Sequence, residues 1–265
     1  MKDEFIVSPG GKISMYALTR EVSPTITKCA LTYHQRQPID PDRARAQHQA
    51  YGDCLRRHGF TVLAAPPAPD LPDAVFVEDA AVVVEELAIL TAPVLPARRA
   101  EVPSMAEALA PYRTLARIEG SATLEGGDVL RVGRTLFVGR TQRTNQEGID
   151  QLAALLRPHD YSVVAVDVKG CLHLKSACSA IGPDTILANR SWFDPLPFAA
   201  YQIIEVADDE PGAANALLLG GTVVLPASFP RTRALLEERG FTVENLDVSE
   251  LQKAEAALTC CSVLF

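Results

Sequence analysis

The sequence lacks a surplus of basic residues, a membrane-length apolar run and any C-x-x-C pair of cysteines. Its 25 Lys and Arg are outnumbered by 33 Asp and Glu, which gives a net charge of −8. Nucleic acid and anionic membranes are therefore excluded as expected partners, because both bind basic surfaces. The longest apolar runs, such as ALLLGGTVVL, are too short to cross a bilayer, and the opening MKDEFIVSPGG does not resemble a secretory signal. We expect a soluble, cytoplasmic protein.

Cysteines are few, six in 265 residues, and in a cytosolic chain of this size reduced thiols are expected rather than disulfides. Apolar residues make up 48% of the chain and charged residues 22%, which indicates one packed domain over residues 1–265. We interpret Cys29, Cys54 and Cys178 as small buried apolar residues. Cys260 and Cys261 fall in the last apolar run, LTCCSVLF, which we predict to be a strand with the two side chains on opposite faces.

Four internal segments share one layout, in which an apolar strand, a tight turn and a second apolar strand follow one another. A polar residue stands near the start of each segment, and a fifth segment opens in the same way; these residues are Glu78, Glu125, His173, Asn215 and Cys260. The steps between them are 47, 48, 42 and 45 residues. A steady period of this length is typical of a repeat architecture.

Helical patterns follow these hairpins, and most of them lead into a further apolar strand. They cover residues 41–59, 102–112, 144–159 and 232–240, with a shorter candidate at 247–257. The predicted unit is therefore strand, strand, helix, strand. The fifth unit lacks a partner strand at its end, and residues 13–20 and 60–66 can supply the missing strands, so that the termini meet and close a ring. An ordinary mixed α/β sheet with accidental spacing is the alternative.

A closed ring would bring the polar residues of equivalent hairpins to one central cavity. A cysteine, a histidine and a carboxylate together suit nucleophilic catalysis, in which a thiolate attacks and an imidazole moves protons. The many carboxylates, which include Asp79 and Asp128, suit a planar cation such as a guanidinium. Taken singly, His173 also fits a core histidine and Gly126–Gly127 a simple turn; their shared phase in the repeat favours a site.

Five segments keep their order across almost the whole chain: PDAVFVEDAAVV, LEGGDVLRVGRTLFVGRTQRTNQEG, CLHLKS, LPASFPRTRALLEERGF and LTCCSVLF. In them the sequence resembles the dimethylarginine dimethylaminohydrolases of the guanidino-group-modifying (pentein) superfamily. The resemblance implies an α/β fold, a five-bladed pseudo-symmetric propeller of ββαβ units. It also implies hydrolysis of asymmetrically dimethylated or monomethylated arginine to citrulline and an alkylamine through a covalent thiouronium, without a cofactor. The implied partner is a small-molecule methylated arginine, and the chain is expected to be a monomer or homodimer.

The resemblance also assigns roles by position. Cys260 resembles the nucleophile, His173 the general acid and base, and Glu125 the carboxylate that orients it. The implied substrate-binding residues are Asp73, Glu78 and Asp79 for the guanidinium, Arg98 and Arg143 for the α-carboxylate, Leu31 in a lid at residues 21–36, and Ala254 through its backbone. The sequence departs from the family at Glu255–Ala256, where Asp-Gly is usual.

Other interpretations remain open on the sequence alone. An arginine deiminase, an amidinotransferase or another guanidine hydrolase would use the same fold, and a catalytically dead binder of arginine-like ligands would keep the acidic cavity. No metal is required, although Cys260, Cys261 and His173 form a candidate site for an inhibitory zinc. A zinc or redox sensor built on those residues is the remaining alternative.

Overall fold

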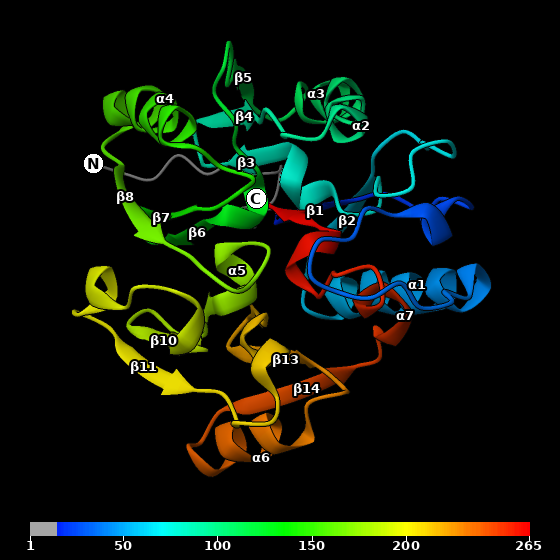
Figure 1. Cartoon of the computed structure of the whole chain (residues 1–265), viewed down its shortest axis with the longest axis vertical. Coiled ribbons are helices and arrows are strands. Elements are labelled where there is room, and N and C mark those ends of the chain that lie inside the picture. The colour runs from blue at the N-terminus through cyan, green and yellow to red at the C-terminus, as the bar shows by residue number, and fades with distance from the viewer. Residues whose placement is uncertain (1–14) are drawn as a thin grey trace, which may run out of the picture.

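The computed structural model describes residues 15–265, which form five three-stranded sheets around a common centre (Figure 1). The sheets are β3 (Ala81–Val83), β4 (Leu87–Leu90) and β5 (Thr114–Arg117); β6 (Val129–Val132), β7 (Thr135–Arg140) and β8 (Ser162–Asp167); β9 (Cys178–Ala180), β10 (Thr185–Ala188) and β11 (Gln202–Glu205); β12 (Leu217–Leu219), β13 (Thr222–Pro226) and β14 (Thr242–Leu246); and β15 (Val263–Leu264), β1 (Tyr16–Thr19) and β2 (Thr61–Ala64). Each sheet has the same pattern. Its central strand pairs antiparallel with one neighbour, β3, β6, β9, β12 or β15, and parallel with the other, β5, β8, β11, β14 or β2. The five repeated units form the pseudo-symmetric propeller expected from the sequence.

The two ends of the chain meet in one sheet, as predicted. Strand β1 pairs antiparallel with β15, with Ala17 opposite Leu264, and parallel with β2 on its other side. One edge of the short terminal strand β15 is therefore paired with β1 rather than left free, which removes a site of unwanted strand pairing. The predicted strand begins at Tyr16; residues 13 and 14 of the prediction lie outside the described part of the chain.

Outer helices cover the ring, and the sequence patterns predicted all of them except a short helix at residues 96–99. They are α1 (Pro41–Arg57), α2 (Pro96–Arg99), α3 (Val102–Leu109), α4 (Gln146–Leu156), α6 (Pro230–Glu238) and α7 (Ser249–Gln252). Local capping explains two of the starts: Asp40 accepts hydrogen bonds from the amides of Asp42 and Arg43 ahead of α1, and Asn145 accepts one from Gly148 ahead of α4. The longer helices α1, α3, α4 and α6 bury apolar side chains; Leu152 of α4, for example, packs in one cluster with Leu136 of β7.

The third unit, which contains His173, departs from the predicted ββαβ order. Between β10 and β11 the chain forms two single turns of 3-10 helix, η5 (Arg190–Trp192) and η6 (Leu196–Phe198), in place of an α-helix. Pro195 and Pro197 lie in this connection, and proline interrupts the hydrogen bonds of a longer helix. Across residues 15–265, none of the helices combines the length and apolar character needed to span a membrane.

A single helical turn precedes the first strand of every unit, which the sequence patterns did not predict. These turns are η2 (Val77–Ala80), η3 (Gly126–Asp128), α5 (Leu174–Ala177), η7 (Pro211–Ala214) and η8 (Thr259–Cys261). The predicted strand at LTCCSVLF is therefore wrong over its first half: Cys260 and Cys261 lie in η8, where Leu258 already has helical backbone angles, and only Val263 and Leu264 form β15. All five polar residues of the repeat lie within or directly beside one of these turns.

Candidate active site

A histidine and a carboxylate form the centre of the site. His173 is the residue before α5, and its Nε2 atom lies 2.8 Å from Oε2 of Glu125, the residue before η3. Asp79 of η2 lies on the same side, with Oδ1 3.9 Å from the same imidazole nitrogen. All three side chains are buried. Three turns from three successive units thus direct one imidazole and two carboxylates to a common point.

The two glycines of the EGGD motif are required by close packing. A Cβ atom on Gly127 would lie 2.5 Å from Nδ1 of His173 and 2.8 Å from Oδ1 of Asp79, and one on Gly126 would overlap the carbonyl oxygen of Glu78. Neither glycine has a positive φ angle, so the plain interpretation of a glycine turn does not account for them. The Gly127 amide also donates a hydrogen bond of 3.0 Å to Asp79. The absence of side chains allows these residues to converge.

Asp128 completes the motif by fixing the backbone beside the histidine. It is fully buried and accepts a hydrogen bond of 3.0 Å from the amide of Leu174, the residue that follows His173. Its other oxygen accepts a bond of 2.7 Å from the hydroxyl of Thr141. The start of α5 is therefore held against η3, and the imidazole position follows from that contact.

The two predicted arginines lie at the site, and both contact its carboxylates. Arg98 is buried and donates to Asp79 at 3.0 Å, to Glu101 at 2.9 Å and to the carbonyl of Phe76 at 2.8 Å. Arg143 lies 3.4 Å from Glu125 and donates to the hydroxyl of Thr32 at 2.9 Å. Arg98 is thus fixed by three partners, whereas Arg143 connects the site to the segment at residues 21–36.

A small cavity of about 30 Å³ joins these residues to the cysteine. Its lining includes the predicted residues Asp73, Asp79, Arg98, Glu125, Arg143, His173, Ala254 and Cys260, with Leu172 and Glu255 among its further members. Two described residues from the sequence prediction, Glu78 and Leu31, lie outside this lining. Leu31 packs instead against the apolar cluster that contains Ile26 and Leu258.

Glu78 takes part in a separate network directly behind the cysteine. It is buried, pairs with Lys175 and accepts a hydrogen bond of 2.9 Å from the hydroxyl of Thr259, the residue before Cys260. The Asn215 side chain donates to the same hydroxyl at 3.0 Å and accepts from the Thr259 amide at 3.2 Å. Glu78 and Asn215 therefore hold the turn that carries Cys260. The sequence patterns missed Lys175 and Thr259, although both stand within the CLHLKS and LTCC motifs.

The charges of the site oppose one another across the cavity. Burial alone would lower the pKa of His173, but Asp79, Asp128 and Glu125 outweigh it and raise that pKa to about 9. Burial, together with the negative charges of Glu78 and Asp79, raises the pKa of the Cys260 thiol to about 12. At neutral pH the site without ligand therefore holds an imidazolium and a protonated thiol, and the thiolate needs an additional positive charge to form.

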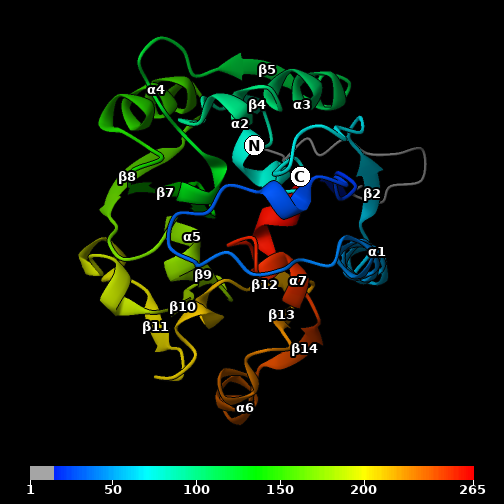
Figure 2. The ribbon, with the colours of Figure 1, turned by 45° about the vertical axis from the view of Figure 1, so that its right-hand side comes forward.

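The segment at residues 21–36, which we call the lid, crosses in front of the centre of the ring in Figure 2, and its residue Ala30 lines the cavity. The amide of Ala30 donates to Asp73 at 3.1 Å, and the amide of Thr32 donates to the carboxylate of Glu255 at 2.8 Å. The next two amides of the lid, those of Tyr33 and His34, donate to the same carboxylate. A cavity of about 30 Å³ is far smaller than the roughly 300 Å³ of small ligand sites, so a ligand the size of arginine enters only when the lid moves.

Glu255 is a residue that the sequence marked only as a departure from the family pattern. Its φ angle is +57°, in the left-handed region that glycine adopts without strain. The unusual conformation directs the carboxylate to three consecutive amides of the lid. A strained residue that binds a loop in this way is typical of functional sites.

The two adjacent cysteines have different surroundings. Cys260 is half-buried and lines both the small cavity and a neighbouring groove of about 360 Å³, whose walls include Trp192 and Phe229. Cys261 is fully buried in an apolar cluster with Tyr51. Among the described residues, the potential metal ligands within 4.8 Å of His173 and of one another are Asp79 and Glu125, and this group includes neither Cys260 nor Cys261. An inhibitory zinc at Cys260, Cys261 and His173 therefore stays a prediction.

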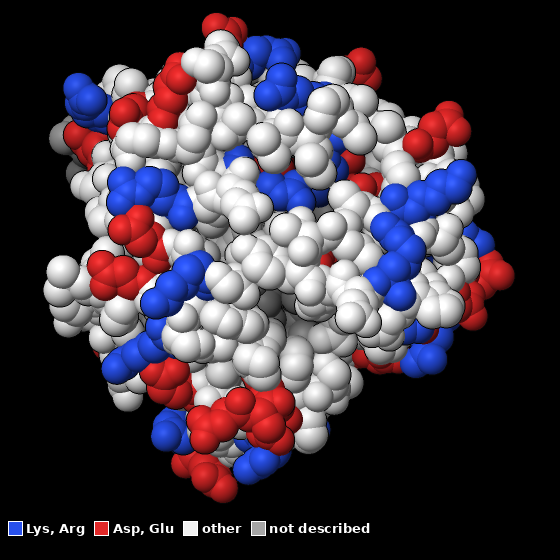
Figure 3. All heavy atoms as spheres, viewed as in Figure 1, with Lys and Arg blue, Asp and Glu red and all other residues white. Residues whose placement is uncertain are grey.

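The face of the molecule seen in Figure 1 is hollowed near its centre (Figure 3). Uncharged side chains predominate around the hollow, and most acidic and basic side chains lie towards the rim. The charged groups of the site, such as Asp79, Glu125 and His173, are buried.

Comparison with known proteins gives consistent results over most of the chain. Residues 25–194 match the model of the family described as N,N dimethylarginine dimethylhydrolase, eukaryotic. The N(G),N(G)-dimethylarginine dimethylaminohydrolase of Streptomyces coelicolor is 39% identical over 94% of this chain and 96% of its own. A structure of the Pseudomonas aeruginosa enzyme, a cysteine-to-serine mutant complexed with citrulline, superposes with a TM-score of 0.89 at 31% identity, over 94% and 98% of the two chains. The N-terminal domain of ArgZ, a cyanobacterial arginine dihydrolase, shares the fold with a TM-score of 0.82 at 20% identity, over 95% and 98%.

Proposed function

Because the chain belongs to the dimethylarginine dimethylaminohydrolase family, we propose that it hydrolyses Nω,Nω-dimethyl-L-arginine and Nω-monomethyl-L-arginine to L-citrulline. The second product is dimethylamine or methylamine. The observation that carries this proposal is the single cavity in which Cys260, His173 and the carboxylate of Asp79 meet. A nucleophile, a proton carrier and an anionic partner for a guanidinium are the three groups that the reaction needs.

Recognition of the guanidinium rests on the carboxylates of the cavity. Asp79 and Asp73 line it, and a planar cation with several N–H donors can bond to two carboxylates at once. Arg143 keeps donors available beyond its two contacts, so we assign it to the α-carboxylate of the substrate. Arg98 shares that assignment, and its bond to Asp79 also holds this carboxylate in place. Closure of the lid would exclude water from the bound guanidinium.

The charge of the substrate supplies what the free site lacks. A guanidinium beside Cys260 lowers the pKa of the thiol, because the cation stabilises the thiolate that burial and Glu78 disfavour. The thiol proton leaves to solvent as the cation binds. The nucleophile is therefore formed mainly in the complex, while His173 already carries the proton that the leaving group needs.

Each proton and bond can be followed through the two steps. The Cys260 thiolate adds to the guanidinium carbon, and the bond from this carbon to the alkylated nitrogen then breaks as His173 donates its proton to that nitrogen. The alkylamine leaves and a thiouronium remains on the sulfur. Water adds to the same carbon as His173 removes one of its protons. The carbon–sulfur bond then breaks, and the remaining hydroxyl proton passes to solvent, where the released alkylamine takes it up. Citrulline and the thiolate are released. Glu125 keeps the imidazole oriented throughout through its 2.8 Å contact.

The test is citrulline release from dimethylarginine, monomethylarginine and arginine, measured side by side with a chelator present. We expect turnover of the two methylated substrates and little or none of arginine. The variant Cys260→Ser should lose turnover and retain substrate binding, whereas Cys54→Ser, whose thiol lies outside the cavity, should keep it. Turnover of arginine alone would replace the proposal with an arginine hydrolase on the same fold.

A further inference from the structure

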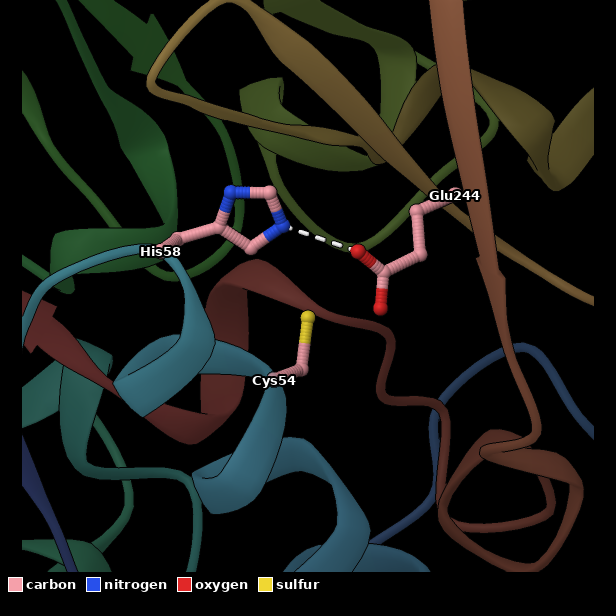
Figure 4. A group of neighbouring side chains, drawn as sticks. All are labelled: Cys54, His58 and Glu244. Carbon is pink, nitrogen blue, oxygen red and sulfur yellow. Dashed lines mark hydrogen bonds and ion pairs between the residues drawn. The ribbon is translucent and has the colours of Figure 1, made fainter.

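A second group of reactive side chains lies away from the active site, between α1 and β14 (Figure 4). Cys54 is in the last turn of α1, and His58 is the residue that ends this helix. A spacing of four residues places both side chains on one face of the helix. Glu244 is the central residue of β14, at the edge of its sheet, and the three side chains point toward one another.

We propose that Cys54, His58 and Glu244 form a binding site for a zinc ion, with water in the fourth position. Thiolate, imidazole and carboxylate are the ligands that Zn²⁺ takes in proteins, and three protein ligands plus water is a common coordination. The sulfur favours zinc over magnesium or calcium, which prefer oxygen ligands alone. This cluster is distinct from Asp79, Glu125 and His173 of the active site.

The distances within the cluster suit one small ion. The sulfur, nitrogen and oxygen ligand atoms all lie within 4.8 Å of one another, and His58 Nε2 is 2.8 Å from Glu244 Oε2. Ligands of a tetrahedral zinc lie about 3.5 Å apart, given bond lengths of about 2.0–2.3 Å. Small side-chain rotations therefore bring the three ligand atoms to the required separation, and the backbone of α1 and β14 need not change.

Burial and access also fit a metal. Cys54 is 1% exposed, and the side chains of His58 and Glu244 are 16% and 29% exposed, so the site has a buried base and an open side for the ion and its water. Without metal, burial raises the pKa of Cys54 to about 11, and the thiol is protonated. On binding, the S–H bond breaks, its proton passes to solvent and the sulfur–zinc bond forms.

The charge around the site balances the ion. A thiolate and a carboxylate together neutralise Zn²⁺, and Arg57 contacts the Oε1 oxygen of Glu244. The Oε2 oxygen, which faces His58, stays available for the metal while Arg57 remains an outer partner of the same carboxylate. Partners of this kind orient the ligands of a metal site.

The geometry also sets what zinc would do. Helix α1 lies in the unit that closes the ring, and β14 lies in the unit before it along the chain. A zinc ion held by both would join two adjacent units. Since the ion binds the folded arrangement, it should raise the unfolding temperature, and the rise should grow with the logarithm of the free zinc concentration once this exceeds the dissociation constant.

The experiment measures zinc affinity by chelator competition, and cobalt binding by the sulfur-to-metal absorption band, in full-length protein carrying Cys260→Ser. This background removes the active-site thiol as a competing ligand. We expect one zinc per chain, a thiolate band with cobalt and a rise in unfolding temperature with zinc. Cys54→Ser should abolish the band, and His58→Gln should weaken zinc more than about 100-fold, because loss of even an outer partner costs 10- to 100-fold.

The control is His159→Gln, which changes a histidine outside the cluster and should leave the affinity unchanged. Because His58 is partly exposed, its variant provides a second test that does not replace the buried Cys54. Zinc affinity that is unaffected by His58→Gln, or the absence of zinc binding to the folded protein, would overturn the proposal. Both results are independent of turnover, so they do not bear on the proposed hydrolase activity.

Sequence reasoning interpreted Cys54 as a buried apolar residue, and its burial agrees with that. The C-x-x-x-H spacing of Cys54 and His58 was the available signal, since it places two zinc ligands on one helical face. The third ligand, Glu244, is far along the chain and is recognisable only in the fold.

Discussion

The charge on His173 is the property of the site that responds most directly to one substitution. Its pKa of about 9 depends on neighbouring carboxylates, and Asp79 contributes most among them. Oδ1 of Asp79 lies 3.9 Å from Nε2 of His173. At an effective dielectric constant of about 20, two unit charges at about 4 Å interact by about 4 kcal/mol, or about 3 pKa units. Asp79→Asn should therefore lower the pKa of His173 from about 9 to about 6.

The assay is an NMR titration of the imidazole ring protons, which does not depend on turnover. The chain has five histidines, so the His173 signal can be assigned by its loss in His173→Gln. Asp53→Asn, which removes an exposed carboxylate on α1, is the matched control and should leave the titration at about 9. A wild-type pKa near the ordinary 6.5, or an Asp79→Asn variant that still titrates near 9, would refute the electrostatic account of the site.

Three further predictions follow from the packing, the lid and the same pKa. Gly127→Ala should displace His173 and reduce kcat at least about 100-fold, as expected for a shift of about 1 Å. The control Gly182→Ala should leave kcat unchanged in steady-state kinetics, because its added Cβ makes only ordinary contacts. Glu255→Gln should weaken the lid, seen as faster amide exchange at residues 32–34, and unchanged exchange there would contradict the assigned contact. A histidine whose pKa is raised on folding stabilises the fold fully below pH 6.5, and this stabilisation is lost as the pH rises to about 9. The free energy of unfolding should therefore fall by about 2 kcal/mol between pH 7 and 9. Denaturant titrations measure this fall, which should be smaller in His173→Gln.

The ring of repeated units could be predicted because the repeat consists of strands and helices, which are recognisable from local patterns of apolar residues. Paired apolar strands and the helices near residues 41–59 and 144–159 have clear periodicity, and α1 and α4 lie there. The single turns such as η8 (Thr259–Cys261) could not be predicted, because one helical turn is too short to show a period. Cys260 therefore lines the cavity with Glu125 and His173, but it lies in a 3-10 turn and not in the predicted strand.

The sequence predicts which residues form the site more readily than it predicts the contacts between them. The common phase of Glu125, His173 and Cys260 brings all three to one cavity. The direction of Glu78, which faces Lys175 and Thr259, depends on the backbone angles of η2 and is not visible in the sequence. The contact between Glu255 and the lid depends on a positive φ angle and on a partner more than 200 residues away, so no local pattern predicts it.

The central claim is that Cys260 forms a covalent bond with the carbon of a methylated guanidinium. The most direct measurement is the mass of the intact protein after acid quenching of a reaction with dimethylarginine, followed by peptide mapping. The variant His173→Gln lacks both the acid for the departing amine and the base for the attacking water. It should therefore form the adduct slowly on long incubation and then retain it, whereas the wild type hydrolyses it. We predict a mass increase equal to the substrate less dimethylamine, located on the peptide that contains Cys260 and absent from Cys260→Ser. Citrulline formation without any adduct in His173→Gln, or an adduct that persists in Cys260→Ser, would contradict the account.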